Sequence, residues 1–177
     1  LPRLTDTASI KFALLQYQKS LKAEFGDLIK GESDVLRALS LSGGEETVSA
    51  ADLKKQAEDV PVVRIVDTLL KHAILQDASD IHIEPGETEL AVRYRIDGLL
   101  HDAMKLPRNV AGSIVARVKV LASLKLDEKR LPQDGRFKVE GDDYKVSFRV
   151  SILPVYDGEK IVMRLLPEDS KGYTLEN

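Results

Sequence analysis

The sequence predicts an α+β fold in which helices back an antiparallel sheet. An amphipathic helical pattern starts at Pro61, and after it the apolar period changes from 3.6 residues to 2, which is typical of half-buried strands. Asp97 and Gly98, between two alternating stretches, form the strongest hairpin signal in the chain. The resulting order is helix, three strands, helix, three strands. This order favours antiparallel hairpins with the helices gathered on one face of the sheet.

Residues 1–60 predict a helical segment that precedes this domain. Apolar side chains recur at three- and four-residue steps over residues 9–29, and a shorter helical pattern follows at residues 34–41. The sequence SGGEET after it is composed like a flexible joint. We therefore expect a helical linker segment over residues 1–44 and a flexible or helical linker over residues 45–60, with a polar helix in AADLKKQAED.

The predicted domain spans residues 61–167. Pro61 suits the first turn of a helix because its missing N–H would be unpaired there anyway, and this helix is expected to end near Gln76. A second helical pattern covers residues 110–124 and leads into a charged loop at residues 125–135. Alternating segments predict six strands, at residues 79–84, 89–96, 99–105, 136–140, 143–153 and 160–166.

The composition argues against several functional classes. The chain has 26 Lys and Arg against 29 Asp and Glu, so it lacks the basic excess that nucleic-acid binding normally needs. Four Phe, five Tyr and no Trp offer few side chains for base stacking. With no cysteine, disulfides and thiolate nucleophiles are excluded. The first residues do not resemble a signal peptide and no long apolar stretch occurs, so we expect a soluble, cytoplasmic protein.

No catalytic or metal-binding motif is present. The sequence contains no GxxxxGK[ST] phosphate loop, no GxGxxG, no GxSxG and no HExxH. His72, His82 and His101 fall on a predicted helix and two different strands, without the spacing of metal ligands. We therefore expect no metal site in the chain.

Two of the first three strands carry opposite charges on their polar faces. Alternation places Asp80, His82 and Glu84 on the outer face of one strand and Arg93 and Arg95 on the outer face of the next. Paired strands would bring these side chains together as a ladder of opposite charges. This structural interpretation is favoured over a binding role for the two arginines.

The last three strands bring cations together. A turn at Tyr156-Asp157 sets Arg149 directly opposite Arg164, and like charges in such a pair are destabilising unless something neutralises them. Neither strand offers an acid on that face, so each arginine needs either a phosphate or a carboxylate from elsewhere in the fold. The residues alone leave these two alternatives open. A turn at Gly141-Asp142 would place Arg136 opposite Ser147.

The loop at residues 125–135 concentrates charge and turn residues. Asp134 and Gly135 predict a turn into the following strand. A solvated connector and a docking surface both fit this composition, since loops held by rigid elements often carry function. The candidate docking residues are Glu128, Arg130, Gln133 and Asp134.

Five motifs in this order resemble one protein family. They are SDIHIEP (79–85), RYRIDG (93–98), ARVKVLASLKLDEKRLPQDGRF (116–137), FRVSILP (148–154) and GEKIVMRLL (158–166). They are similar to the second N-terminal domain of the secretion and pilus ATPases, the GspE type of type II secretion and the PilB type of type IV pilus assembly. The branches for pilus assembly, secretion and DNA uptake share these motifs.

The resemblance implies a PAS-like fold and a place in a larger motor. It implies that a RecA-like ATPase domain follows a linker that starts at residues 168–177, and that this domain binds ATP and Mg²⁺ within a hexamer. Arg149 and Arg164, with Arg136, would then reach toward the ATP γ-phosphate. The implied partners are neighbouring subunits and platform proteins of the inner membrane, and the implied location is the cytoplasm beside that membrane. The alternative is a stand-alone PAS-like module that binds a ligand or a protein.

Overall fold

The structure is a computed structural model that describes residues 50–141 and 144–167. The first half contains helices α3 (Ala50–Glu58) and α4 (Val60–Leu75) and strands β1 (Asp80–Pro85), β2 (Glu89–Ile96) and β3 (Leu99–Pro107). The second half contains α5 (Ala111–Leu121), entered through a 3₁₀ turn, and strands β4 (Gln133–Glu140), β5 (Lys145–Val155) and β6 (Gly158–Pro167). The predicted α+β plan is confirmed. The helical patterns at residues 9–29 and 34–41 and the SGGEET joint lie outside the described residues.

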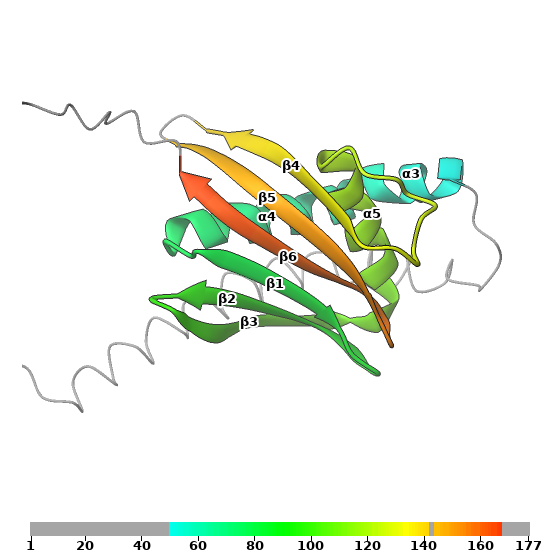
Figure 1. Ribbon diagram of the computed structural model, residues 1–177, viewed down its shortest axis with the longest axis horizontal. Helices are drawn as coiled ribbons and strands as arrows, with labels where there is room; N and C mark the ends of the chain where they lie inside the picture. The colour runs from blue at the N-terminus through cyan, green and yellow to red at the C-terminus, as the bar shows by residue number, and fades with distance from the viewer. Residues whose placement is uncertain (1–49, 142–143, 168–177) are drawn as a thin grey trace, which may run out of the picture.

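The six strands form one antiparallel sheet in the order β3-β2-β1-β6-β5-β4 (Figure 1). Each half of the chain contributes three consecutive strands, and the halves join where β1 pairs with β6. In this pair Asp80 lies opposite Arg164, although the two residues are far apart in the sequence. Strand order therefore places the polar ladder of the first half beside the cations of the second.

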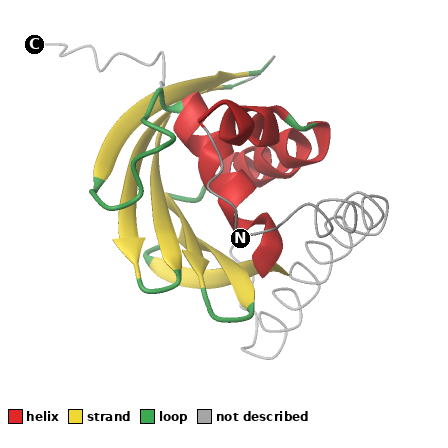
Figure 2. Ribbon diagram, turned by 90° about the vertical axis from the view of Figure 1, so that its right-hand side faces the viewer, coloured by secondary structure: helices red, strands yellow, loops and turns green. Residues whose placement is uncertain are grey.

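The helices cover one face of the sheet, which curls around them (Figure 2). α4 and α5 pack on this face, and α3 lies against α5 and α4. No helix of the described residues covers the opposite face. Side chains that point away from the helices, among them the arginines of β4, β5 and β6, thus lie on an open surface of the described chain.

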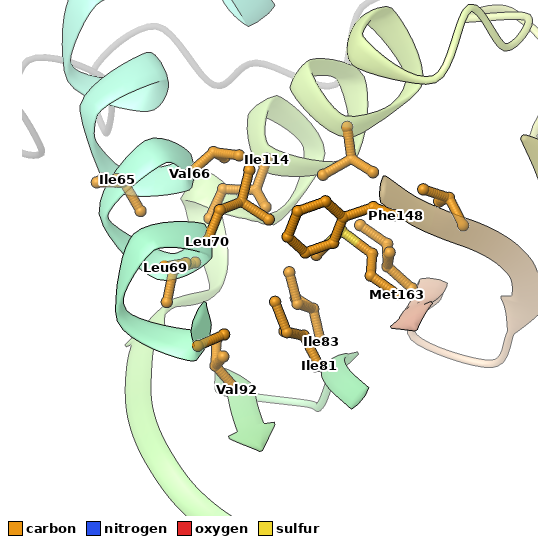
Figure 3. Packing of buried hydrophobic residues seen from close by; sticks show 14 of the residues in the cluster. Ile65, Val66, Leu69, Leu70, Ile81, Ile83, Val92, Ile114, Phe148 and Met163 are labelled. Carbon is orange, nitrogen blue, oxygen red and sulfur yellow. The ribbon is translucent and has the colours of Figure 1, made fainter. Parts of the chain in front are cut away.

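The core between sheet and helices is apolar and continuous. Phe148 and Met163 from the second half of the sheet meet Ile81 from the first, with Leu70 of α4 and Ile114 of α5 above them (Figure 3). All five are at most 2% exposed, and burying each such side chain contributes roughly 1.5–3 kcal/mol to folding. This shared core holds the two halves together and fixes the open face.

Two hairpins form where the sequence predicts them. Asp97 and Gly98 adopt φ of 50° and 80°, the left-handed conformations that a tight turn between Ile96 and Leu99 requires. Val155 pairs with Gly158 around the turn at Tyr156-Asp157. The register of that hairpin places Arg149 opposite Arg164, as predicted.

The register of the β4–β5 hairpin differs from the prediction. Arg136 lies opposite Arg149, not opposite Ser147. The change moves each pairing by two residues, so every side chain keeps its face and the apolar pattern alone fits both registers. In the observed register the rings of Phe137 and Phe148 stack with their centroids 4.9 Å apart, an aromatic cross-strand contact that favours this pairing.

Candidate anion-binding site

A row of five charged side chains crosses the open face of the sheet. In successive strand pairings it runs from Arg95 on β2 through Asp80 on β1 and Arg164 on β6 to Arg149 on β5 and Arg136 on β4. Neighbouring strands lie about 4.8 Å apart, so the three arginines of the second half extend over roughly 10 Å. Four arginines and one aspartate leave the row with a strong excess of positive charge.

Strands β5 and β6 carry no acid on the face of Arg149 and Arg164, and Asp80 of the neighbouring strand β1 supplies one. Its side chain is 6% exposed and accepts a hydrogen bond from Nε of Arg164 at 2.9 Å. The other carboxylate oxygen lies 3.3 Å from Nε of Arg95 and accepts a 2.9 Å hydrogen bond from the hydroxyl of Ser79. The sequence left two partners open for Arg164, a phosphate or a carboxylate from elsewhere in the fold. The structure shows the carboxylate, which is Asp80.

Burial raises the pKa of the Asp80 carboxyl, and its contacts lower it. Hydrogen bonds from Arg164 and Ser79, together with the charges of Arg164 and Arg95, outweigh burial, so that the pKa lies below the usual value for an aspartate. Asp80 is thus held as a carboxylate with a cation on each side.

Acid should weaken the fold partly through Asp80. A carboxylate with a lowered folded-state pKa contributes stability that is complete above its unfolded pKa of about 3.9 and is lost as pH falls through the folded value. In urea titrations, the free energy of unfolding of the wild-type chain should fall more steeply below about pH 4 than that of Asp80→Asn. Equal slopes would show that Asp80 does not titrate as described.

Arg149 and Arg136 differ from Arg164. Both side chains are exposed, and neither makes a hydrogen bond or ion pair with another described residue. A depression of about 270 Å³ lies in front of Arg149 and Arg164, lined by Asp80, Arg149, Ser151, Val162 and Arg164. Exposed guanidinium groups around a small hollow can bind an anion such as phosphate by charge-assisted, bidentate hydrogen bonds.

The predicted ladder of opposite charges forms beside this row. Glu84 pairs with Arg93 and, at 2.6 Å, with Lys160. Burial raises the pKa of the Glu84 carboxyl, but hydrogen bonds and charges from Lys160 and Arg93 lower it overall. Burial, followed by the charge of Lys160, lowers the pKa of His82 below its usual value. Arg93 and Arg95 thus have acidic partners, which supports the structural interpretation.

Two of the four candidate docking residues, Glu128 and Gln133, hold their own loop together through their side chains. The Glu128 side chain accepts hydrogen bonds from the backbone N–H groups of Arg130 and Leu131, at 2.7 and 3.1 Å. The Gln133 side chain bonds the backbone of Lys125 and the carbonyl of Glu128. The Arg130 side chain is exposed.

The predicted turn at Asp134 and Gly135 is wrong. Both residues lie in β4, where Asp134 pairs with Ser151 and accepts a hydrogen bond from its hydroxyl. A Cβ on Gly135 would lie 2.8 Å from the carbonyl oxygen of Ala122, so glycine is needed for close packing rather than for a turn.

A buried ion pair that the sequence did not suggest anchors this loop. Lys119 of α5 is 1% exposed, and its Nζ lies 2.7 Å from a carboxylate oxygen of Glu159 on β6. The same Nζ donates a 2.7 Å hydrogen bond to the carbonyl of Glu128. One side chain therefore ties helix, loop and sheet together. A lysine between apolar helix positions offers no sequence signal for such burial.

Fold and site together define an α+β domain that presents a row of arginines on an open sheet face. Residues 55–177 match the family model described as "Type II/IV secretion system protein". The chain belongs to this family.

Curated relatives support the same assignment. The type IV pilus assembly ATPase PilB of Myxococcus xanthus is 39% identical over 168 residues, which are 94% of this chain and 29% of the relative. The type II secretion system protein E of Klebsiella pneumoniae is 38% identical over 175 residues, 99% of this chain and 35% of the relative. The chain thus spans about a third of the length of these relatives. Among the described residues, no helix is long and apolar enough to cross a membrane.

Proposed function

We propose that residues 61–167 are the second N-terminal, PAS-like domain of a hexameric type IV pilus assembly or type II secretion ATPase. Residues 1–44 and 45–60 would link it to what precedes, and residues 168–177 would begin the linker to a RecA-like ATPase domain. The names of the relatives, and the third of their length that the chain matches, support this proposal. Neighbouring subunits and platform proteins of the inner membrane are the proposed partners, and the cytoplasmic side of that membrane is the proposed location.

Within this motor, Arg149 and Arg164, with Arg136, would contact the γ-phosphate of ATP. The observation that carries the proposal is the alignment of the three arginines on adjacent strands, with Arg149 and Arg164 lining one depression. Their side chains fit a phosphate, whose oxygens accept the paired N–H groups of a guanidinium. Phosphoryl transfer also needs a phosphate cradle and Mg²⁺, which the ATPase domain would supply. This chain alone is therefore not expected to hydrolyse ATP.

The arginines would also report whether the γ-phosphate is present. A ligand shifts a conformational equilibrium only by the difference in its affinity for the two states. ATP differs from ADP by the group that the arginine row would contact, so ATP would favour the closed arrangement of this domain on the ATPase domain. Loss of the γ-phosphate would release this domain from the ATPase domain, and a rigid-body movement of the domain would follow.

Binding of ATP and ADP by the full-length protein tests this role. Arg149→Ala should weaken the affinity for a non-hydrolysable ATP analogue about ten-fold or more, because charge-assisted hydrogen bonds are lost. The affinity for ADP should stay unchanged, since ADP has no γ-phosphate. Both constants can be measured by isothermal titration calorimetry.

Lys145→Ala is the matched control for this measurement. Lys145 lies on the same strand and the same face as Arg149, about 13 Å along the strand, and pairs with Glu140 instead of facing the depression. The control should bind both nucleotides like the wild type. An unchanged ratio of ATP-analogue to ADP affinity in Arg149→Ala would exclude the proposed contact with the γ-phosphate.

A further inference from the structure

Arg164 is held along only one edge of its guanidinium group. Its Nε donates to Asp80 at 2.9 Å, while the side chain remains 65% exposed. Its terminal nitrogens make no hydrogen bond or ion pair with another described residue. A guanidinium carries five N–H donors in a flat fork, so one edge can bind a carboxylate while the other binds a second anion.

The carboxylate that holds this edge is itself fixed. Asp80 is buried in a strand that pairs on both sides, and the Ser79 hydroxyl and Arg95 bind its second oxygen. The backbone of Ser79 adds one hydrogen bond to each neighbouring strand, to the carbonyl of Arg95 at 2.8 Å and from the N–H of Leu165 at 3.0 Å. Asp80 therefore cannot move without disturbing three strands.

No carboxylate among the described residues holds Arg149 or Arg136. Neither has a partner among the described residues, although Arg149 directly faces Arg164. The three arginines of β4, β5 and β6 thus fall into two kinds: Arg164, which a buried acid orients, and two that no other described residue holds. An oriented donor loses less conformational entropy when it binds than a mobile one does.

We propose that Asp80 is a positioning residue for Arg164: it binds the Nε edge and leaves the terminal nitrogens directed toward the bound anion. This inference rests on the proposed function in taking the anion to be the γ-phosphate. It has a specific consequence, because Asp80 also opposes anion binding through its negative charge. Removing that charge should impair the orientation of Arg164 without weakening the attraction for ATP.

Side-chain NMR of the 177-residue chain tests the orientation without any nucleotide. The Nε–H protons of Arg164 and Arg95 should exchange with water at least about ten-fold more slowly than those of Arg149 and Arg136, since only the former are bound to Asp80. Asp80→Asn should raise the exchange rate of Arg164 toward that of Arg149. If Arg164 and Arg149 exchange equally fast in the wild type, the proposal is wrong, whether or not the variant folds.

Glu84→Gln is the matched control on the same strand. Glu84 pairs with Arg93 and Lys160 on the open face and makes no contact with Arg164. Its replacement should leave the exchange rate of the Arg164 proton unchanged. Accelerated exchange at Arg164 in this variant would mean that general loosening of β1, rather than loss of the Asp80 contact, explains the result.

Steady-state kinetics of the full-length protein test the consequence for the motor. Asp80→Asn should lower kcat about ten-fold while KM for ATP stays equal or falls, because orientation is lost and a negative charge is removed. Arg164→Lys keeps the charge but has no Nε edge, and should lose kcat to a similar extent. Unchanged kcat in both variants would overturn the positioning role. If Arg164→Ala also keeps wild-type kcat, the proposed function itself fails, whereas the exchange measurement still decides on the Asp80 contact.

Discussion

Replacing Arg149 with alanine in the full-length protein should lower kcat for ATP hydrolysis by at least about ten-fold, toward the ~10³-fold that arginine fingers can contribute. Arg149 is exposed and has no partner among the described residues, so its loss removes no contact that holds the domain together. It also removes a like charge directly opposite Arg164. The melting temperature of the 177-residue chain should therefore stay equal or rise slightly.

Arg164→Ala should lower kcat by a similar factor but differ in its effect on stability. It leaves Asp80 with one cation instead of two, so the melting temperature should fall slightly. Lys145→Ala again serves as the control that removes a cation from the same face of the sheet. If both arginine variants keep wild-type kcat, the arginine row has no role in ATP hydrolysis.

The sequence predicted the fold better than it predicted the contacts of the site. The change of apolar period and the hairpin signals give all six strands, because each depends on residues close together in the chain. They do not give the register of β4 against β5, because moving the pairing by two residues keeps every side chain on its face. That movement decides whether Arg136 lies beside Arg149 or two residues away.

The partner of Arg164 depended on strand order, which periodicity does not determine. Alternation placed Asp80 on the polar face of the sheet, and only the pairing of β1 with β6 brings it to Arg164.

The contacts of the loop at residues 125–135 could not be predicted from the sequence either. Glu128 and Gln133 are charged or polar in a loop, which fits an interaction surface, yet their side chains bond the loop backbone. Hydrogen bonds of this kind need three-dimensional positions to be recognised.

Among the charged residues that the structure describes, replacing Lys119 should lower the stability most. Its side chain is 1% exposed and pairs with Glu159, which is 9% exposed. Lys119→Met leaves the Glu159 carboxylate buried without a counter-ion and removes one of the two side-chain donors to the Glu128 carbonyl. Breaking a buried ion pair from one side typically costs about 3–5 kcal/mol, a large share of the stability of a small domain. Urea unfolding of the chain, followed by circular dichroism, measures this loss.

Two further variants separate charge from packing. The double variant Lys119→Met/Glu159→Leu removes both charges and should recover much of the lost stability, since an apolar pair of similar volume often replaces a buried ion pair without loss. Lys105→Met breaks an exposed pair with Glu89, whose charges water already screens, and should change stability little. If Lys119→Met cost no more than Lys105→Met, the buried pair would not anchor the loop. A cost that the double variant reverses would show that Lys119→Met destabilises the fold by leaving the buried Glu159 carboxylate without its counter-ion.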